Sequence, residues 1–254
     1  MLTFIIFYLK LHKKLKNYIK RFFPTKIEIN RVKKILYLGF PSALHSFFEV
    51  AFFISAIWMS GFIGKNSQAA NQIALNLSSM TYMIALGVGV AAMIRVGNQR
   101  GMMNFKKLRE VALSTLSLII IIDIFFCLIF LLFNDYLPLL YLDPSVPANL
   151  SDVNDVLSIA SKLLIVAGVF QLFDGIQAVV LGALRGMQDV NKPAAIIFLS
   201  YGLIGFPISY YLGFYTSLST VGIWIGLLSG LFSSALFLFL RFNYLSKKII
   251  ALND

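Results

Sequence analysis

The sequence predicts an all-α integral membrane protein, a bundle of six transmembrane helices. Two properties of the whole chain predict this class: 59% of its 254 residues are hydrophobic, and the mean hydropathy is +0.82. Only 13% of the residues are charged, whereas a soluble domain usually has about 25%. Because a single soluble core cannot hide so much apolar surface, much of the chain is expected to face lipid.

The six spans are apolar stretches long enough to cross a bilayer, which takes about 20 residues in a helix. Glu49 is the only charge between residues 37 and 64, and Asp123 the only one between residues 111 and 134. The uncharged stretch 193–240 is long enough for two spans, which a turn-rich segment divides. The predicted spans are 37–62, 69–95, 109–134, 156–183, 193–215 and 219–243.

The basic residues alternate between the segments that join these spans. Twenty of the 22 Lys and Arg residues fall in segments on one side of the predicted membrane, and only Lys65 lies in a segment on the other side. The positive-inside rule therefore predicts that both termini are cytoplasmic. The net charge of +11 is spread as a topology signal and not gathered into one patch, so no nucleic-acid partner is expected. The frequent Lys, Ile and Asn residues favour a bacterial source, hence the cytoplasmic (inner) membrane.

The chain divides into three parts around this bundle. Residues 1–34 hold the short apolar stretch Met1 to Leu9 and a basic segment. They are interpreted as the tail of a preceding helix, or an interfacial anchor, followed by a cytoplasmic linker. Residues 35–248 form the predicted bundle, and residues 249–254 a cytoplasmic tail.

Two acids inside the predicted spans are the main functional candidates. An ionised acid at the bilayer centre costs roughly 2.5–3.5 kcal/mol on insertion scales. Glu49 lies about 18 Å into its span, and Asp174 about 14 Å from the same membrane face, at about 1.5 Å per residue. At matched depth on packed helices they can share one cation or one proton. The alternative is that each is a structural acid, protonated and hydrogen-bonded to a neighbouring helix.

Five further polar side chains are candidates for lining a cavity: His45, Gln72, Asn76, Gln171 and Gln177. The histidine lies one helical turn from the first acid, where it either relays protons or only packs. The glutamines and the asparagine form polar stripes, which either line a cavity or hold helices together. Pro41 and Pro207 lie within predicted spans and are candidates for kinks. Asp123 receives no role.

No sequence motif indicates an enzyme. Cys127 is the only cysteine, which excludes an intrachain disulfide and a cysteine-cluster metal site. There is no phosphate-binding loop, no zinc-ligand spacing and no nucleophile elbow. No cofactor is therefore expected beyond a coupling ion, Na⁺ or H⁺.

Three stretches together resemble a known family. They are "LGFPSALHSFFEVAFF" (38–53), "AANQIALNLSSMTYMIALGVGVAAMIRVGNQRG" (69–101) and "FQLFDGIQAVVLGALRGMQDVNKP" (170–193). They resemble the multidrug and toxic compound extrusion (MATE) transporters, and in particular the C-terminal bundle of the bacterial sodium-coupled type. The resemblance covers residues 31–248, nearly the whole chain.

The resemblance implies a function for the two acids. Family members have two six-helix bundles that rock around a cleft and export organic cations in exchange for Na⁺ or H⁺. The family's acids fall on Glu49 and Asp174, which implies that these two carry the coupling cation, with Na⁺ as one candidate ion.

This chain has six predicted spans where the family has twelve helices. The resemblance therefore implies an N-terminal six-helix half as a partner, from the same gene, a separate chain or a second copy. The chain is then a fragment, a truncated gene product or a half-transporter. Two alternatives stay open: a lipid-linked oligosaccharide flippase of the same superfamily, and a non-transporting membrane assembly subunit.

Overall fold

The structure is a computed structural model that describes residues 28–142 and 150–253. Its described part is helical, without strands, and contains six helices long and apolar enough to cross a membrane. The predicted fold class and number of spans are thereby confirmed. The elements are α3 (Ile29–Ile63), α4 (Lys65–Gly101), α5 (Phe105–Leu132), the short η1 (Leu137–Leu140), α6 (Leu150–Gly186), α7 (Asn191–Leu199), η3 (Ser200–Gly205), α8 (Phe206–Phe214) and α9 (Ser219–Ala251).

The chain divides into two compact units, residues 1–40 and 41–254. The described part of the first unit is the exposed beginning of α3. The expected helix tail Met1 to Leu9 and most of the basic linker lie outside the described residues. The site and the helix packing described below belong to the second unit.

Most helices are longer than the predicted spans. α3 begins at Ile29 and α9 continues to Ala251, so part of the expected linker and of the expected tail is helical. A helix can be longer than its apolar span because polar turns extend it beyond the hydrocarbon without ending it. α5 is shifted instead: Asn104 caps it, its side chain accepting from the Lys107 N–H, and it ends at Leu132.

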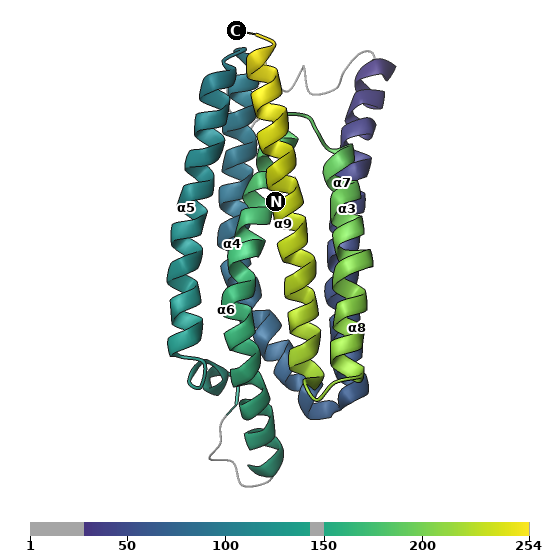
Figure 1. Cartoon of the computed structure of the whole chain (residues 1–254), viewed down its shortest axis with the longest axis vertical. Helices are drawn as coiled ribbons and strands as arrows, with labels where there is room; N and C mark the ends of the chain where they lie inside the picture. Colours follow the sequence, from purple (N-terminus) through teal and green to yellow (C-terminus); the bar gives the residue numbers. More distant parts are fainter. Residues whose placement is uncertain (1–27, 143–149, 254) are drawn as a thin grey trace, which may run out of the picture. The chain divides into compact units, whose positions relative to one another are not determined.

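Helices α6 and α9 are the central elements of the second unit (Figure 1). α6 packs against α4, α5 and α9, and α9 packs against α8 and η3. α3 meets the other helices through aromatic side chains: Phe52 stacks on Tyr201 at 4.6 Å between ring centroids, and Phe53 meets Phe170 edge-on at 5.9 Å. These contacts place α3 beside α6 and the fifth span.

Small residues let the central helices approach closely. A Cβ added to Gly182 of α6 would lie 2.1 Å from the Gly89 carbonyl oxygen of α4. A Cβ on Gly226 of α9 would lie 2.2 Å from the Ser209 backbone nitrogen of α8. Close backbone packing at small residues stabilises helix pairs in lipid, where burial of apolar surface gives no driving force between helices.

The fifth span contains the wide turns of a π-helix. η3 occupies Ser200–Gly205 and directly precedes Pro207, which lies in the first turn of α8. A proline ring inside an α-helix clashes with the carbonyl four residues earlier, and a local π-turn is one way to relieve such a clash. Pro41, the other kink candidate, lies inside the continuous helix α3.

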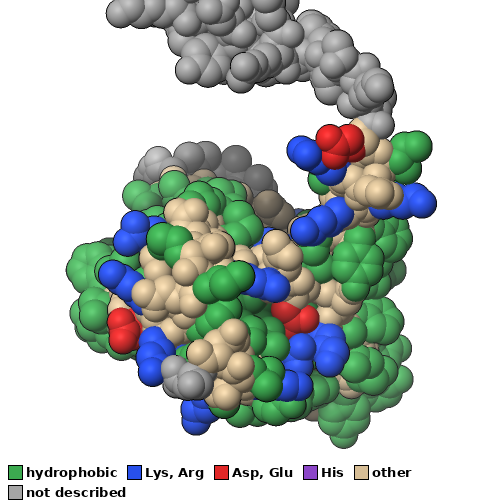
Figure 2. Space-filling view, turned by 90° about the horizontal axis from the view of Figure 1, so that it is seen from above, with side chains coloured by type: hydrophobic (Ala, Val, Ile, Leu, Met, Phe, Trp, Pro, Cys, Tyr) green, Lys and Arg blue, Asp and Glu red, His purple; other side chains and the backbone are tan. Residues whose placement is uncertain are grey.

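The two ends of the second unit differ in charge. Figure 2 looks onto the end where α9 finishes, and Lys and Arg side chains gather on it. Arg109 of α5 donates to the Asn243 and Ser246 side chains of α9 there, and Arg241 pairs with Asp189 at 2.9 Å. At the opposite end, the Lys65 ammonium lies 2.7 Å from the Asp152 carboxylate.

Candidate cation-binding cavity

A cavity of about 370 Å³ lies between α3, α4 and α6. Both acids singled out in the sequence are in its wall: Glu49 comes from α3 and Asp174 from α6. The other lining side chains include no Lys or Arg. They are Val50, Phe53, Ile57, Gln72, Leu75, Asn76, Ser78, Ser79, Tyr82 and Phe170.

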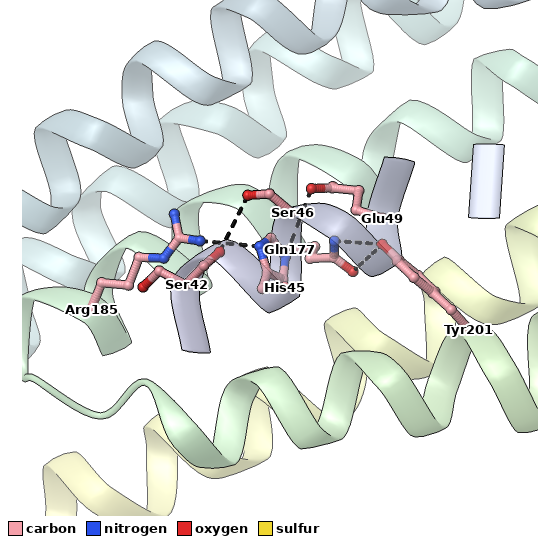
Figure 3. A network of polar contacts seen from close by, with 7 residues as sticks. All are labelled: Ser42, His45, Ser46, Glu49, Gln177, Arg185 and Tyr201. Atoms are coloured by element: carbon pink, nitrogen blue, oxygen red, sulfur yellow. Dashed lines mark hydrogen bonds and ion pairs between the residues drawn. The ribbon is translucent and has the colours of Figure 1, made fainter. Parts of the chain in front are cut away.

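Glu49 is held among polar neighbours from three helices. Its carboxylate is in hydrogen-bond contact with the Tyr82 side chain of α4. One carboxylate oxygen, Oε2, lies 3.8 Å from His45 Nε2, one turn earlier on α3. Its side chain is 13% exposed, so a bound cation at this carboxylate would be largely shielded from solvent. Figure 3 shows His45 in contact with Arg185 on one side and near the Glu49 carboxylate on another.

Asp174 is more deeply buried than Glu49, with 5% of its surface exposed. Its Oδ1 has no hydrogen-bond partner among the described residues, and neither has either amide atom of Gln171. Both side chains also border a narrow crevice that is too small to hold a water molecule. Buried polar groups in proteins are normally paired, so the free oxygens here are available to a cation or a proton.

Asp123 of α5 joins the same neighbourhood. It borders the same narrow crevice, is 2% exposed and leaves Oδ2 without a partner among the described residues. A Cβ added to Gly175 would lie 1.8 Å from that oxygen, so the Asp123 carboxyl rests against the backbone next to Asp174. No role was predicted for Asp123 from the sequence. The glycine that follows Asp174 was the signal that a side chain from another helix enters there.

Gln72 and Asn76 of α4 lie in the cavity wall and also line a second cavity of about 430 Å³. The second cavity is bounded by Tyr141 and Asp152 near the less basic end of the bundle. Because two cavities share both side chains, this pair separates the acids from the space at that end.

His45 and Gln177 are buried but do not line the main cavity. The His45 Nδ1 atom lies 3.1 Å from Arg185 Nη2 of α6. Gln177 and Tyr201 form two reciprocal hydrogen bonds of 2.7 and 3.0 Å between α6 and η3 (Figure 3). Of the two roles considered for the polar stripes, cavity lining and holding helices together, Gln177 therefore has the second.

The donor set suits a hard monovalent cation or a proton. Carboxylates, amide oxygens and hydroxyls are the ligands that hard ions prefer, whereas transition metals favour imidazole and thiolate. Among the described residues there is no group of three or more His, Cys, Asp or Glu side chains that could hold a metal ion. The ligands that the cavity wall offers to a cation are two carboxylates and several neutral amide and hydroxyl oxygens.

Comparison with known proteins identifies the family to which this chain belongs. The MatE family model matches residues 41–211. A probable multidrug resistance protein NorM of Agrobacterium fabrum is 34% identical over 247 residues, which are 96% of this chain and 52% of that protein. A probable NorM of Bacillus subtilis is 36% identical over 217 residues, 85% of this chain and 46% of its own length.

Solved structures agree on the fold. A crystal structure of MATE in the bent conformation has a TM-score of 0.79 at 18% identity, covering 90% of this chain and 49% of that one. The crystal structure of the eukaryotic MATE transporter AtDTX14 has a TM-score of 0.76 at 21% identity, covering 92% and 54%.

The chain belongs to the MatE family, and the resemblance identified in its sequence is confirmed. It spans about half the length of the curated relatives it matches. That share fits the expected six-helix half of a twelve-helix transporter.

Proposed function

We propose that this chain is the C-terminal half of a secondary active multidrug exporter, which exchanges organic cations for Na⁺ or H⁺. The observation that carries the proposal is the cavity with two acids and no basic residue in its wall. Such a wall attracts cations and repels anions. The relatives are named as multidrug resistance proteins, which agrees with organic cations as substrates.

The mechanism we propose is alternating access with competition at the two acids. A coupling cation binds at Glu49 and Asp174 and favours the state from which substrate leaves. Such a shift requires that the cation bind one state more tightly than the other. Asp174 contributes the unpaired Oδ1, and Glu49 is the more accessible of the two acids, so the organic cation is expected to meet Glu49 first.

The orientation we propose puts both termini in the cytoplasm of a bacterium, with the bundle in its inner membrane. The gathering of Lys and Arg at the end of the bundle where α9 finishes supports this, because cytoplasmic ends carry the excess of basic residues (Figure 2). The second cavity, at the less basic end, would then open toward the outside.

The partner we propose is an N-terminal six-helix half. Large apolar side chains of α3 and α4 beside the cavity are exposed: Val50, Ile54, Trp58, Met80, Met83 and Ile84. An unpartnered bundle would also expose the polar wall of its cavity to lipid, where unsatisfied polar groups are costly. We therefore expect the chain alone to be inactive in transport.

The test is efflux of a fluorescent organic cation from cells that express the whole transporter. Glu49→Gln and Asp174→Asn keep the size of each side chain and remove its charge. We expect both to abolish cation-driven efflux. Glu110→Gln is the matched control, because Glu110 is an exposed acid on α5 away from the cavity. Unchanged efflux in both acid variants would overturn the proposal.

The two alternatives make different predictions in the same assay. A lipid-linked oligosaccharide flippase needs basic groups to meet pyrophosphate, and the cavity wall has none. A non-transporting assembly subunit tolerates replacement of both acids and co-purifies with a stable partner. Loss of efflux in Glu49→Gln would therefore disfavour both alternatives.

A further inference from the structure

The contact between Arg185 and His45 fixes which imidazole nitrogen carries the hydrogen. A guanidinium has N–H donors and no acceptor. At 3.1 Å from Arg185 Nη2, His45 Nδ1 must therefore be the acceptor and carry no hydrogen. The neutral imidazole then has its hydrogen on Nε2. That nitrogen is the one facing Glu49.

His45 lies between the positively charged Arg185 and the cavity acid Glu49. His45 is 4% exposed, so water does not compete strongly for its ring. Its Nε2 has no hydrogen-bond partner among the described residues and lies 3.8 Å from Glu49 Oε2. A small side-chain adjustment brings this donor into contact with the carboxylate. Arg185 of α6 contacts the other ring nitrogen, Nδ1 (Figure 3).

We propose that Arg185 and His45 are positioning residues that act as a tethered substitute for the coupling cation at Glu49. When the cation leaves, the His45 N–H, held in the required tautomer by Arg185, satisfies the same carboxylate oxygen. When the cation binds, it displaces that N–H. The buried Glu49 carboxylate therefore keeps a partner after the cation is released. This inference rests on the proposed function of Glu49 and names the group that competes there.

Both members of this pair oppose cation binding in the same direction. The Arg185 charge repels a second cation near Glu49, and the His45 N–H occupies a position that the cation needs. Removing either is therefore expected to increase cation affinity and to slow cation release. A residue with only a structural role would give weaker binding or no change. The sign of the effect separates the two explanations.

The first test is the tautomer, which can be read without any transport assay. The sequence has only two histidines, so ¹⁵N-histidine labelling of a His12→Gln variant reports on His45 alone. In lipid bilayers we expect NMR to find neutral His45 with hydrogen on Nε2. Arg185→Met should give a mixture of tautomers, and Arg185→Lys should restore part of the original signal. Hydrogen on Nδ1 of the unaltered ring, or no change in Arg185→Met, would overturn the proposal.

The second test is Na⁺ binding to the whole transporter, with Na⁺ itself as the probe. His45→Phe and Arg185→Met should each increase Na⁺ affinity by at least about fivefold, the lower end of usual coupling between sites. Arg95→Met is the matched control, an exposed arginine of α4 near the same end of the bundle. Saturating Na⁺ should also move the His45 Nε2 resonance. Reduced affinity in both variants, or a resonance that ignores Na⁺, would refute the tethered substitute.

The two proposals fail in different ways. If Glu49→Gln leaves efflux unchanged, the coupling role of Glu49 is wrong, although His45 still has the expected tautomer. If Glu49→Gln abolishes efflux but Arg185→Met leaves the tautomer unaltered, the coupling role stands and the tethered substitute is wrong.

Discussion

Trp224 of α9 donates its indole N–H to Asn71 Oδ1 of α4 across 2.8 Å, and both side chains are fully buried. The bond joins two helices that each pack against α6. The Trp224 ring also meets Phe170 edge-on, with 5.6 Å between centroids. Phe170 lies in the cavity wall. This hydrogen bond therefore helps to hold Trp224 against Phe170, and so helps to fix the cavity wall.

Trp224→Phe tests this link. We expect the free energy of unfolding in detergent to fall by about 0.6 kcal/mol, the average for hydrogen bonds between membrane helices, and by no more than about 1.7 kcal/mol, the largest value. Circular dichroism during denaturation measures the change. Asn71→Leu provides the second arm of a double-mutant cycle. Two effects that simply add would contradict the bond, because removing either partner should already remove it.

Two glycines of α4 form a matched pair for helix packing. A Cβ on Gly89 would lie 2.8 Å from the Ala178 carbonyl oxygen of α6, whereas a Cβ on Gly87 would meet nothing within 4 Å. Gly89→Ala should destabilise the bundle by about 1–3 kcal/mol through overpacking. Gly87→Ala should stabilise it by about 0.5–1 kcal/mol, because alanine restricts the unfolded chain. Thermal melting of both variants decides the matter, and equal effects would argue against the close α4–α6 crossing.

The water content of the cavity can be tested with single cysteines. Cys127 is buried, and Cys127→Ala provides a cysteine-free background. In that background Asn76→Cys should react with a membrane-impermeant thiol reagent, because Asn76 lines both cavities. Ile121→Cys is the control, since Ile121 is 67% exposed on α5 but does not line either cavity.

The reaction at residue 76 should be slowed by an organic cation and should be faster from outside the cell. Thiols in lipid rarely ionise, so the control should remain nearly unreactive although it is more exposed. Equal labelling of both positions would mean that the cavity is filled by lipid. Faster labelling from the cytoplasmic side would reverse the proposed orientation.

Two ion pairs of similar length should differ in their effect on stability. Arg241 and Asp189 are 2.9 Å apart with side chains 19% and 15% exposed, and they join α9 to the connection before α7. Arg241→Met should reduce the free energy of unfolding by about 1.5–3 kcal/mol, because a partly buried charge loses its partner. Lys65→Met should have almost no effect, since that pair is exposed and solvated.

Denaturation curves of the two variants, recorded at two salt concentrations, measure this difference. Salt should weaken the exposed pair and leave the shielded one nearly unchanged. A larger loss in Lys65→Met than in Arg241→Met would show that burial does not control the strength of these pairs.

The sequence predicted the fold class and the span count because the bilayer imposes a length and a composition that are visible in single stretches. It also predicted matched depths for Glu49 and Asp174, since depth follows from counting residues along a helix, and in the structure both acids line one cavity. It did not predict the partners Tyr82 and Arg185, because these depend on how each helix is rotated about its axis. Arg185 was interpreted only as a topology signal.

Gln177 illustrates the limit most clearly. Counting by three placed it on the Asp174 face of α6, and it was expected to line a cavity or join helices. α6 packs against helices on several sides, so a polar residue on any of its faces finds a neighbour. The neighbour here is Tyr201, whose position depends on η3. Periodicity within one helix cannot reveal an irregular turn in another.

The π-helix of the fifth span has a consequence for insertions and deletions. Each extra residue accommodated in a wide turn rotates the following helix by about 100° relative to an uninterrupted α-helix, given 3.6 residues per turn. Ser209, which is fully buried against Gly226, owes its direction to that rotation. Deleting one residue between 200 and 205 would barely change the composition and hydropathy of the chain, but it would turn Ser209 away from α9. The number of residues in this segment, more than their chemistry, therefore determines which face of α8 packs against α9.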